Sequence, residues 1–156
     1  MNRTLKIVVL SLFVFSLATW AADDSNIGTW KLNVDKSKYS PGPAPRSLIV
    51  RWEQSGNNGV KYSDDQVDAK GASTHGGYTA NYDGKDYPWT GNPDADTISL
   101  KRIDANTVGI TWKKAGKVTV TARRAVSKDG KTITITQKGS NAQGQPVNNV
   151  LVLDKQ

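Results

Sequence analysis

The side chains in this sequence that could do chemistry are few. The only histidine is His75, which precedes two glycines. Acidic residues gather in two groups, Asp64, Asp65 and Asp68 and then Asp94 and Asp96. A lone histidine is weak evidence for a haem ligand, neither acidic group has the spacing of a calcium-binding loop, and no Gly-x-Ser-x-Gly motif is present. We predict no catalytic residue, no metal site and no cofactor, so an enzyme is the less favoured interpretation.

Two arginines are better suited to binding. Arg102 and Arg124 fall in phase with the apolar residues of their segments. A guanidinium group can donate two parallel hydrogen bonds to a carboxylate, which makes either residue a candidate for holding an acidic ligand. The structural alternatives are that Arg124 stacks on Trp30 and that Arg102 leaves the interior beside Asp104.

Aromatic residues occupy the same apolar phase. We expect one inward face to carry Trp52, Tyr62, Tyr78, Tyr82 and Trp112 together with Ala80 and Ala122. Such a lining can enclose a small apolar or aromatic molecule, with phenol and indole groups to orient it. The same rings could instead fill a narrow barrel completely. Both interpretations stay open at the level of sequence.

The segments that must position these residues alternate between apolar and polar positions with a period of two. Val108, Ile110 and Trp112, for example, oppose Gly109, Thr111 and Lys113, which is the pattern of a half-buried strand. Short turns rich in Gly, Asp and Asn separate the segments and favour antiparallel neighbours. The pattern predicts strands at 28–34, 46–53, 59–69, 73–83, 85–89, 97–103, 107–114, 117–127, 131–138 and 147–154.

These strands predict an all-β fold. An antiparallel up-and-down meander of eight to ten strands removes its exposed edges by closing into a barrel, and an open sandwich is the alternative. The one long connection, Asp35 to Arg46, contains Pro41, Pro43 and Pro45. We expect it to be an extended strap over one end of the barrel rather than a helix.

The first 21 residues have the features of a signal peptide. A basic start with Arg3 and Lys6 precedes the apolar run from Ile7 to Leu17, and Thr19-Trp20-Ala21 provides a cleavage site. Residues 22–156 then form one domain that carries 19 Lys and Arg against 14 Asp and Glu. The sequence has no Cys, which excludes disulfides and thiol chemistry. We expect a periplasmic or secreted protein with no transmembrane segment in its mature form.

Four short stretches resemble known proteins. Gly28-Thr29-Trp30 looks like the G-x-W signature of the lipocalin and calycin superfamily, in which the Trp closes one barrel end against a late Arg or Lys. Similar stretches in small secreted bacterial lipocalin-like proteins match GTWKL at 28–32, YDGKDYP at 82–88, GNPDAD at 91–96 and KDGK at 128–131. The resemblance implies a calycin-like barrel with a structural latch formed by Gly28, Trp30 and Arg124. The disulfide of many secreted lipocalins and the helical lid of fatty-acid-binding proteins have no counterpart here.

These observations favour a monomeric, exported, non-enzymatic protein that binds a small hydrophobic or aromatic molecule. The predicted ligand-binding residues are Trp52, Tyr62, Tyr78, Tyr82, Arg102, Trp112 and Arg124. The alternative is a periplasmic protein-binding module or hydrolase inhibitor with a filled barrel, which would insert residues 22–27 or the strap into its target. An enzyme would need a reactive ligand among Tyr78, Tyr82, Arg102 and Arg124. We expect no nucleic-acid partner, because export separates the protein from such targets.

Overall fold

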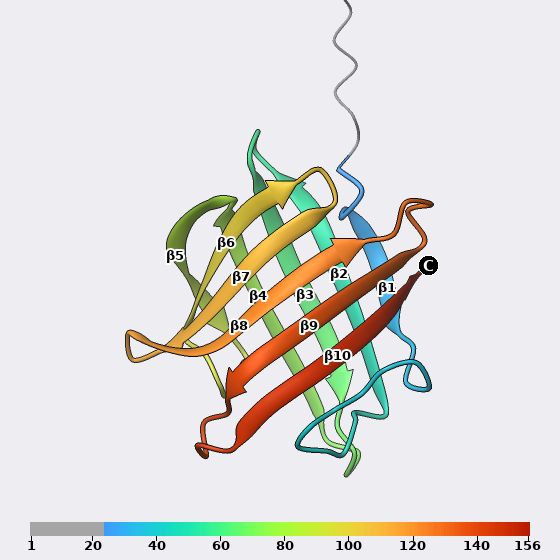
Figure 1. Cartoon of the computed structure of the whole chain (residues 1–156), viewed down its shortest axis with the longest axis vertical. Coiled ribbons are helices and arrows are strands. Elements are labelled where there is room, and N and C mark those ends of the chain that lie inside the picture. Colours follow the sequence, from blue (N-terminus) through green and yellow to red (C-terminus); the bar gives the residue numbers. More distant parts are fainter. Residues whose placement is uncertain (1–23) are drawn as a thin grey trace, which may run out of the picture.

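The computed structural model describes residues 24–156, which form ten β-strands (Figure 1). The strands are β1 (Gly28–Leu32), β2 (Ser47–Ser55), β3 (Gly59–Val67), β4 (Ser73–Asn81), β5 (Asp83–Thr90), β6 (Thr97–Asp104), β7 (Thr107–Lys114), β8 (Lys117–Val126), β9 (Thr132–Ser140) and β10 (Pro146–Lys155). All ten predicted strands are present, and their ends differ from the prediction by at most two residues. The predicted signal peptide lies outside the described residues.

The strands close into one antiparallel barrel. Each strand pairs with the next in the chain, and β1 completes the circle by pairing with both β2 and β10. The barrel prediction is therefore confirmed, and the open sandwich is excluded. No segment within residues 24–156 is a helix with the length and apolar character that a membrane span requires.

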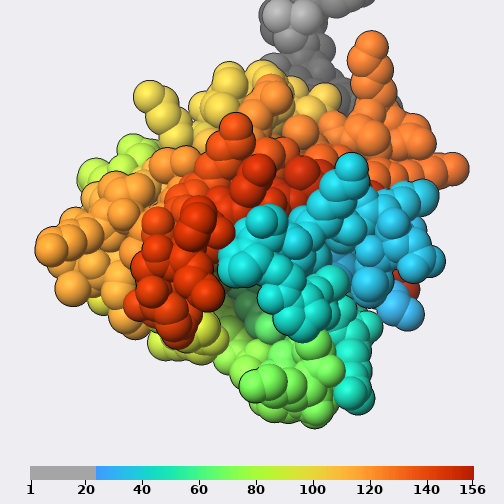
Figure 2. All heavy atoms as spheres, turned by 60° about the horizontal axis from the view of Figure 1, so that its bottom comes forward, coloured from blue at the N-terminus to red at the C-terminus, as the bar shows by residue number. Residues whose placement is uncertain are grey.

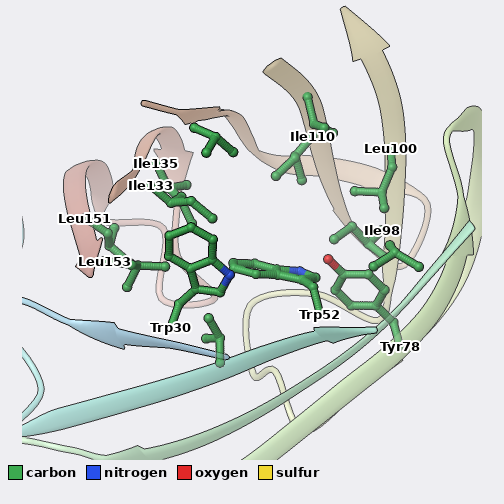
Figure 3. Close-up of a cluster of buried hydrophobic side chains, with 14 of the residues drawn as sticks. Trp30, Trp52, Tyr78, Ile98, Leu100, Ile110, Ile133, Ile135, Leu151 and Leu153 are labelled. Atoms are coloured by element: carbon green, nitrogen blue, oxygen red, sulfur yellow. The ribbon is translucent and has the colours of Figure 1, made fainter. Parts of the chain in front are cut away.

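Alternation along each strand places the apolar residues inside. On β2, for example, Leu48, Val50 and Trp52 are buried. Figure 3 shows Trp30, Trp52 and Tyr78 projecting from β1, β2 and β4 towards the aliphatic side chains of the opposite wall. That wall comprises Ile98, Leu100, Ile110, Ile133, Ile135, Leu151 and Leu153. The interior thus has a ring-rich side and an aliphatic side.

The run of paired residues between neighbouring strands is shortest between β4 and β5. Only Gly77 with Thr90 and Tyr78 with Trp89 are paired there, whereas β3 and β4 pair along their whole length. Gly91 follows with a φ of 80°, and a Cβ at this position would collide with the backbone carbonyl of His75. Glycine is therefore required where the β5–β6 loop leaves this seam.

The strap, residues 35–46, lies at one end of the barrel as predicted. Lys38 N–H donates to the Val150 carbonyl at 2.7 Å and Val150 N–H donates back at 2.8 Å. Asn148 N–H in turn donates to the Ser40 carbonyl at 2.7 Å. The strap therefore continues along β10 beyond the point where β1 ends. We call this end, with the β3–β4, β5–β6 and β9–β10 connections, the mouth of the barrel.

Candidate functional site: a cavity at the mouth of the barrel

A cavity of about 400 Å³ extends from the mouth into the barrel. Figure 2 looks towards this end and shows a hollow between the strap, the β3–β4 turn and the β9–β10 turn. A space of this volume lies within the range of small-molecule sites. The side chains that decide its chemistry are Tyr39, Trp52, Tyr62, Asp64, Tyr78, Trp89, Trp112 and Arg124, with aliphatic residues opposite them.

Five of the seven predicted ligand-binding residues line this cavity, namely Trp52, Tyr62, Tyr78, Trp112 and Arg124. The other two, Tyr82 and Arg102, are not part of the lining. Arg102 lies further along β6, towards the closed end, and Tyr82 is the turn residue between β4 and β5 at that same end. Their predicted contact with a ligand in this cavity is therefore not supported by their position.

The ring-rich wall is continuous. The rings of Tyr62 and Tyr78 stack with centroids 4.7 Å apart, and Trp52 lies 5.6 Å from Tyr62. Trp89 meets Tyr78 edge-on at 5.5 Å and Trp112 at 5.1 Å, so the series crosses the short seam between β4 and β5. Edge-to-face and offset contacts of this kind are favourable and hold the rings in fixed orientations. The wall offers both ring faces and ring edges to a ligand.

Arg124 is the basic group of the cavity wall. It is 0 % exposed, and its guanidinium carbon lies 4.4 Å from the centre of the Trp52 ring. Its Nη2 donates to the Tyr82 hydroxyl at 3.3 Å, while Nε and Nη1 are buried without a hydrogen-bond partner. Removing a cation from water without an acceptor is costly. The unused N–H groups therefore mark a place where an acceptor from outside the chain would be stabilised.

The predicted latch has a different composition in the structure. Arg124 takes Trp52 rather than Trp30 as its cation–π partner, and Trp30 instead has the Lys155 ammonium 5.2 Å from its ring centre. Gly28 leaves room for this lysine, because a Cβ there would lie 3.3 Å from Cε of Lys155. The partner of Trp30 is thus the basic residue at the end of the neighbouring strand, β10.

The segment before β1 closes the end of the barrel opposite the mouth. Trp30 is 0 % exposed and its indole N–H donates to the Asn26 carbonyl at 3.2 Å. Asn26 is also 0 % exposed, and its amide donates to Asp24 at 2.8 Å. Residues 24–27 are therefore folded against the barrel.

Arg102 belongs to this closed end. It forms an ion pair with Asp24 at 2.5 Å and lies 4.1 Å from the centre of the Tyr82 ring. Burial disfavours the charged form of Asp24, but hydrogen bonds from Arg102 and Asn26 outweigh it and hold the pKa of this carboxyl below its usual value. Arg102 thus has an internal acidic partner and fastens the N-terminal segment to β6.

Asp24→Asn is expected to destabilise the protein by about 1–3 kcal/mol at neutral pH, because it leaves a partly buried Arg102 without its carboxylate. A carboxyl whose pKa is lower in the folded state contributes stability above its unfolded pKa and loses it as the pH falls through the folded pKa. The difference from wild type should therefore shrink below about pH 4. Urea denaturation at pH 7 and pH 3 measures this, with the exposed Asp35→Asn as the charge-matched control. A difference that does not change with pH would contradict the assignment.

Of the eight side chains that decide the chemistry of the cavity, Tyr39, Asp64 and Trp89 were not among the predicted ligand-binding residues. Trp89 alternates with Pro88 and Thr90, and Asp64 continues the inward phase of Val60 and Tyr62, so the period of two could have identified both. Tyr39 lies in the strap, where no periodicity indicates a direction. Burial raises the pKa of Tyr39, Tyr62 and Tyr78, so these phenols stay protonated and can donate hydrogen bonds.

The remaining polar groups noted in the sequence have local partners. His75 Nδ1 lies 2.6 Å from Asp65, which also binds Arg51 at 2.7 Å, and all three are on the outer surface. Asp94 accepts from Ala142 N–H at 2.7 Å, which ties the β5–β6 loop to the β9–β10 turn across the mouth. Asp68 accepts from Lys70 and Ala72 N–H within its own turn. The contacts of Asp68 and Asp94 organise the loops of the mouth.

Comparison with known proteins identifies the fold. No protein-family model and no curated protein matches the sequence. Among solved structures, the chain is similar to the zebrafish ileal bile acid-binding protein complexed with cholic acid, with a TM-score of 0.51, 14% identity and coverage of 85% of this chain and 99% of that one. It is also similar to a redesigned β-barrel, with a TM-score of 0.51, 11% identity and coverage of 85% and 92%. The chain therefore has the fold of a ten-stranded calycin-like barrel.

Proposed function

We propose that this protein binds a small apolar or aromatic molecule non-covalently inside its barrel and holds an acidic group of that molecule with Arg124. The observation that carries the proposal is the fully buried guanidinium group with two unpartnered nitrogens on the wall of a cavity of about 400 Å³. The ring-rich and aliphatic walls supply apolar contact, and the arginine supplies orientation. The bile acid-binding protein of similar fold, whose structure contains cholic acid, lends support by analogy.

Two features favour binding over the filled-barrel inhibitor. An interior packed solid would leave no cavity, whereas this one exceeds the volume of about 300 Å³ at which ligand sites begin. Residues 24–27, which an inhibitor would insert into its target, are instead packed at the closed end, where Asn26 is 0 % exposed. Of the four residues that a catalytic role would need, Tyr82 and Arg102 lie outside the cavity lining.

Titration with small acids tests this function. Biphenyl-4-carboxylic acid, dodecanoic acid and cholate should each be added while tryptophan emission is followed, because Trp52, Trp89 and Trp112 line the cavity. We expect a saturable change for at least one acid with a Kd below about 1 mM. If none of the three binds more tightly than that, the proposed function should be abandoned.

We also propose that the binding domain acts outside the cytoplasm. Support comes from the basic start and apolar run of residues 1–21, which lie outside the described part of the chain. Protein recovered from the envelope or medium of the source cells should begin at Ala22 or Asp23 when its N-terminus is sequenced. Recovery of protein that still begins at Met1 would contradict export by a cleaved leader.

A further inference from the structure

A second charged group faces the same cavity. Asp64 lies on the inward face of β3, opposite Val50 of β2 and Gly76 of β4, and it lines the cavity. Its carboxylate extends over the β4 backbone, where a Cβ on Gly76 would lie only 2.8 Å from Oδ2. The absence of a side chain at Gly76 thus makes room for a carboxylate inside the barrel wall.

Asp64 has no basic partner in the described part of the chain. The ion pairs of residues 24–156 involve Asp24, Glu53, Asp65 and Asp86. The adjacent Asp65 takes both Arg51 and His75 on the outer surface, so the two neighbouring carboxylates have opposite surroundings. A partly buried carboxylate without a cation is unfavourable, which is consistent with burial raising the pKa of Asp64.

The two charged groups lie at different depths along one wall. Arg124 rests on the Trp52 ring at 4.4 Å, and Trp52 lies 5.6 Å from Tyr62. Asp64 is the next inward residue of β3 after Tyr62, roughly 7 Å further towards the mouth. A ligand that lies along these rings would therefore meet a cation at its inner end and a carboxylate at its outer end.

The rings beside Asp64 also suit a cation. Tyr62 precedes it on the same face, and Trp89 lies 6.1 Å from Tyr62, measured between ring centroids. Ring faces attract ammonium groups, and the attraction is larger where water is excluded. Asp68 and Asp94 line the same mouth and add negative charge, although their carboxylates accept hydrogen bonds from backbone N–H groups of the mouth loops.

We propose that the ligand of this cavity is amphoteric, with an apolar or aromatic body, an acidic group that binds Arg124 and a protonated amine that binds Asp64. This inference rests on the proposed function and deepens it. It assigns Asp64 as a residue that selects ligands carrying an amine at the end opposite to the acid. Simple acids would use only the inner half of the site.

Two probes that differ in one aminomethyl group test the inference by isothermal titration calorimetry. 4′-(Aminomethyl)biphenyl-4-carboxylic acid should bind the wild-type protein at least about tenfold more tightly than biphenyl-4-carboxylic acid, because it adds a charge-assisted hydrogen bond in a partly buried place. Asp64→Asn should remove this advantage, so that the two probes bind this variant with affinities within about twofold of each other. Asp65→Asn is the matched control, since it removes the same charge one residue away on the outer surface, and it should retain the advantage.

The outcomes separate the two proposals. If biphenyl-4-carboxylic acid binds but the added amine brings no gain in the wild type, or brings the same gain in Asp64→Asn, the amphoteric ligand is overturned and the proposed function stands. If neither probe binds and the panel of acids also fails, both are overturned. Circular dichroism checks the fold of each variant, and the absence of a gain in the wild type overturns the inference even if Asp64→Asn does not fold.

Discussion

Replacement of Trp30 by alanine is expected to lower the free energy of unfolding by about 3–5 kcal/mol. Trp30 is 0 % exposed, and its indole closes the end of the barrel opposite the cavity. The substitution would leave a void in the buried cluster that includes Leu32, Val50 and Leu153 and would remove the hydrogen bond to Asn26. Urea denaturation followed by far-ultraviolet circular dichroism measures the loss.

Trp30→Phe is the control for this effect. It keeps most of the buried ring and loses the N–H group that donates to Asn26 at 3.2 Å, so a smaller loss of about 1–2 kcal/mol is expected. A loss below about 1 kcal/mol for Trp30→Ala would mean that the indole does not hold this end closed. Because Trp30 is not part of the cavity lining, the folded fraction of Trp30→Phe should bind acids as the wild type does.

Arg124→Met is expected to weaken the binding of biphenyl-4-carboxylic acid by about 10- to 100-fold. The free energy of unfolding of the ligand-free protein should not fall by more than about 1 kcal/mol. A hydrogen bond to a charged group contributes about 1.5–3 kcal/mol, which gives the loss of affinity. The stability of the free protein should be retained, because methionine fills a similar space and does not bury a cation whose Nε and Nη1 lack hydrogen-bond partners. Calorimetric titration and urea denaturation measure the two effects separately.

Arg123→Met provides the matched comparison, since Arg123 is the adjacent residue of β8 and is exposed on the outer face. It should not change the affinity for the acid. Biphenyl-4-carboxamide, which lacks the negative charge, should bind wild type and Arg124→Met with similar affinity. Equal losses for the acid and the amide would show that Arg124 acts through the shape of the wall and not through its charge.

The strands could be predicted from the sequence because a period of two is a local property. Each of the ten segments alternates between inward and outward positions, and short turns separate most of them. The same alternation correctly assigned Trp52, Tyr62, Tyr78, Trp112 and Arg124 to the interior. Asp64 and Trp89 have the same inward phase, so the alternation indicates these two residues as well.

Depth along the barrel could not be predicted in this way. Alternation gives the face on which a side chain lies, but the cavity occupies only the part of the interior near the mouth. Arg102 is four residues beyond Ile98 on β6, roughly 13 Å further towards the closed end, so it meets Asp24 instead of the cavity. Asp24 lies before the first strand, where no pattern indicates a partner. The placement of Arg124 on Trp52 likewise depends on how strands distant in sequence face one another across the closed barrel.

The central claim is that Arg124 holds an acidic ligand inside the barrel, and a crystal structure of the protein with biphenyl-4-carboxylic acid tests it most directly. We predict that the biphenyl rings lie in the cavity against Tyr62 and Trp89 and that the carboxylate accepts hydrogen bonds from Nε or Nη1 of Arg124 at about 2.7–2.9 Å. An interior filled by the protein's own side chains, or a ligand bound only on the outer surface, would contradict the claim.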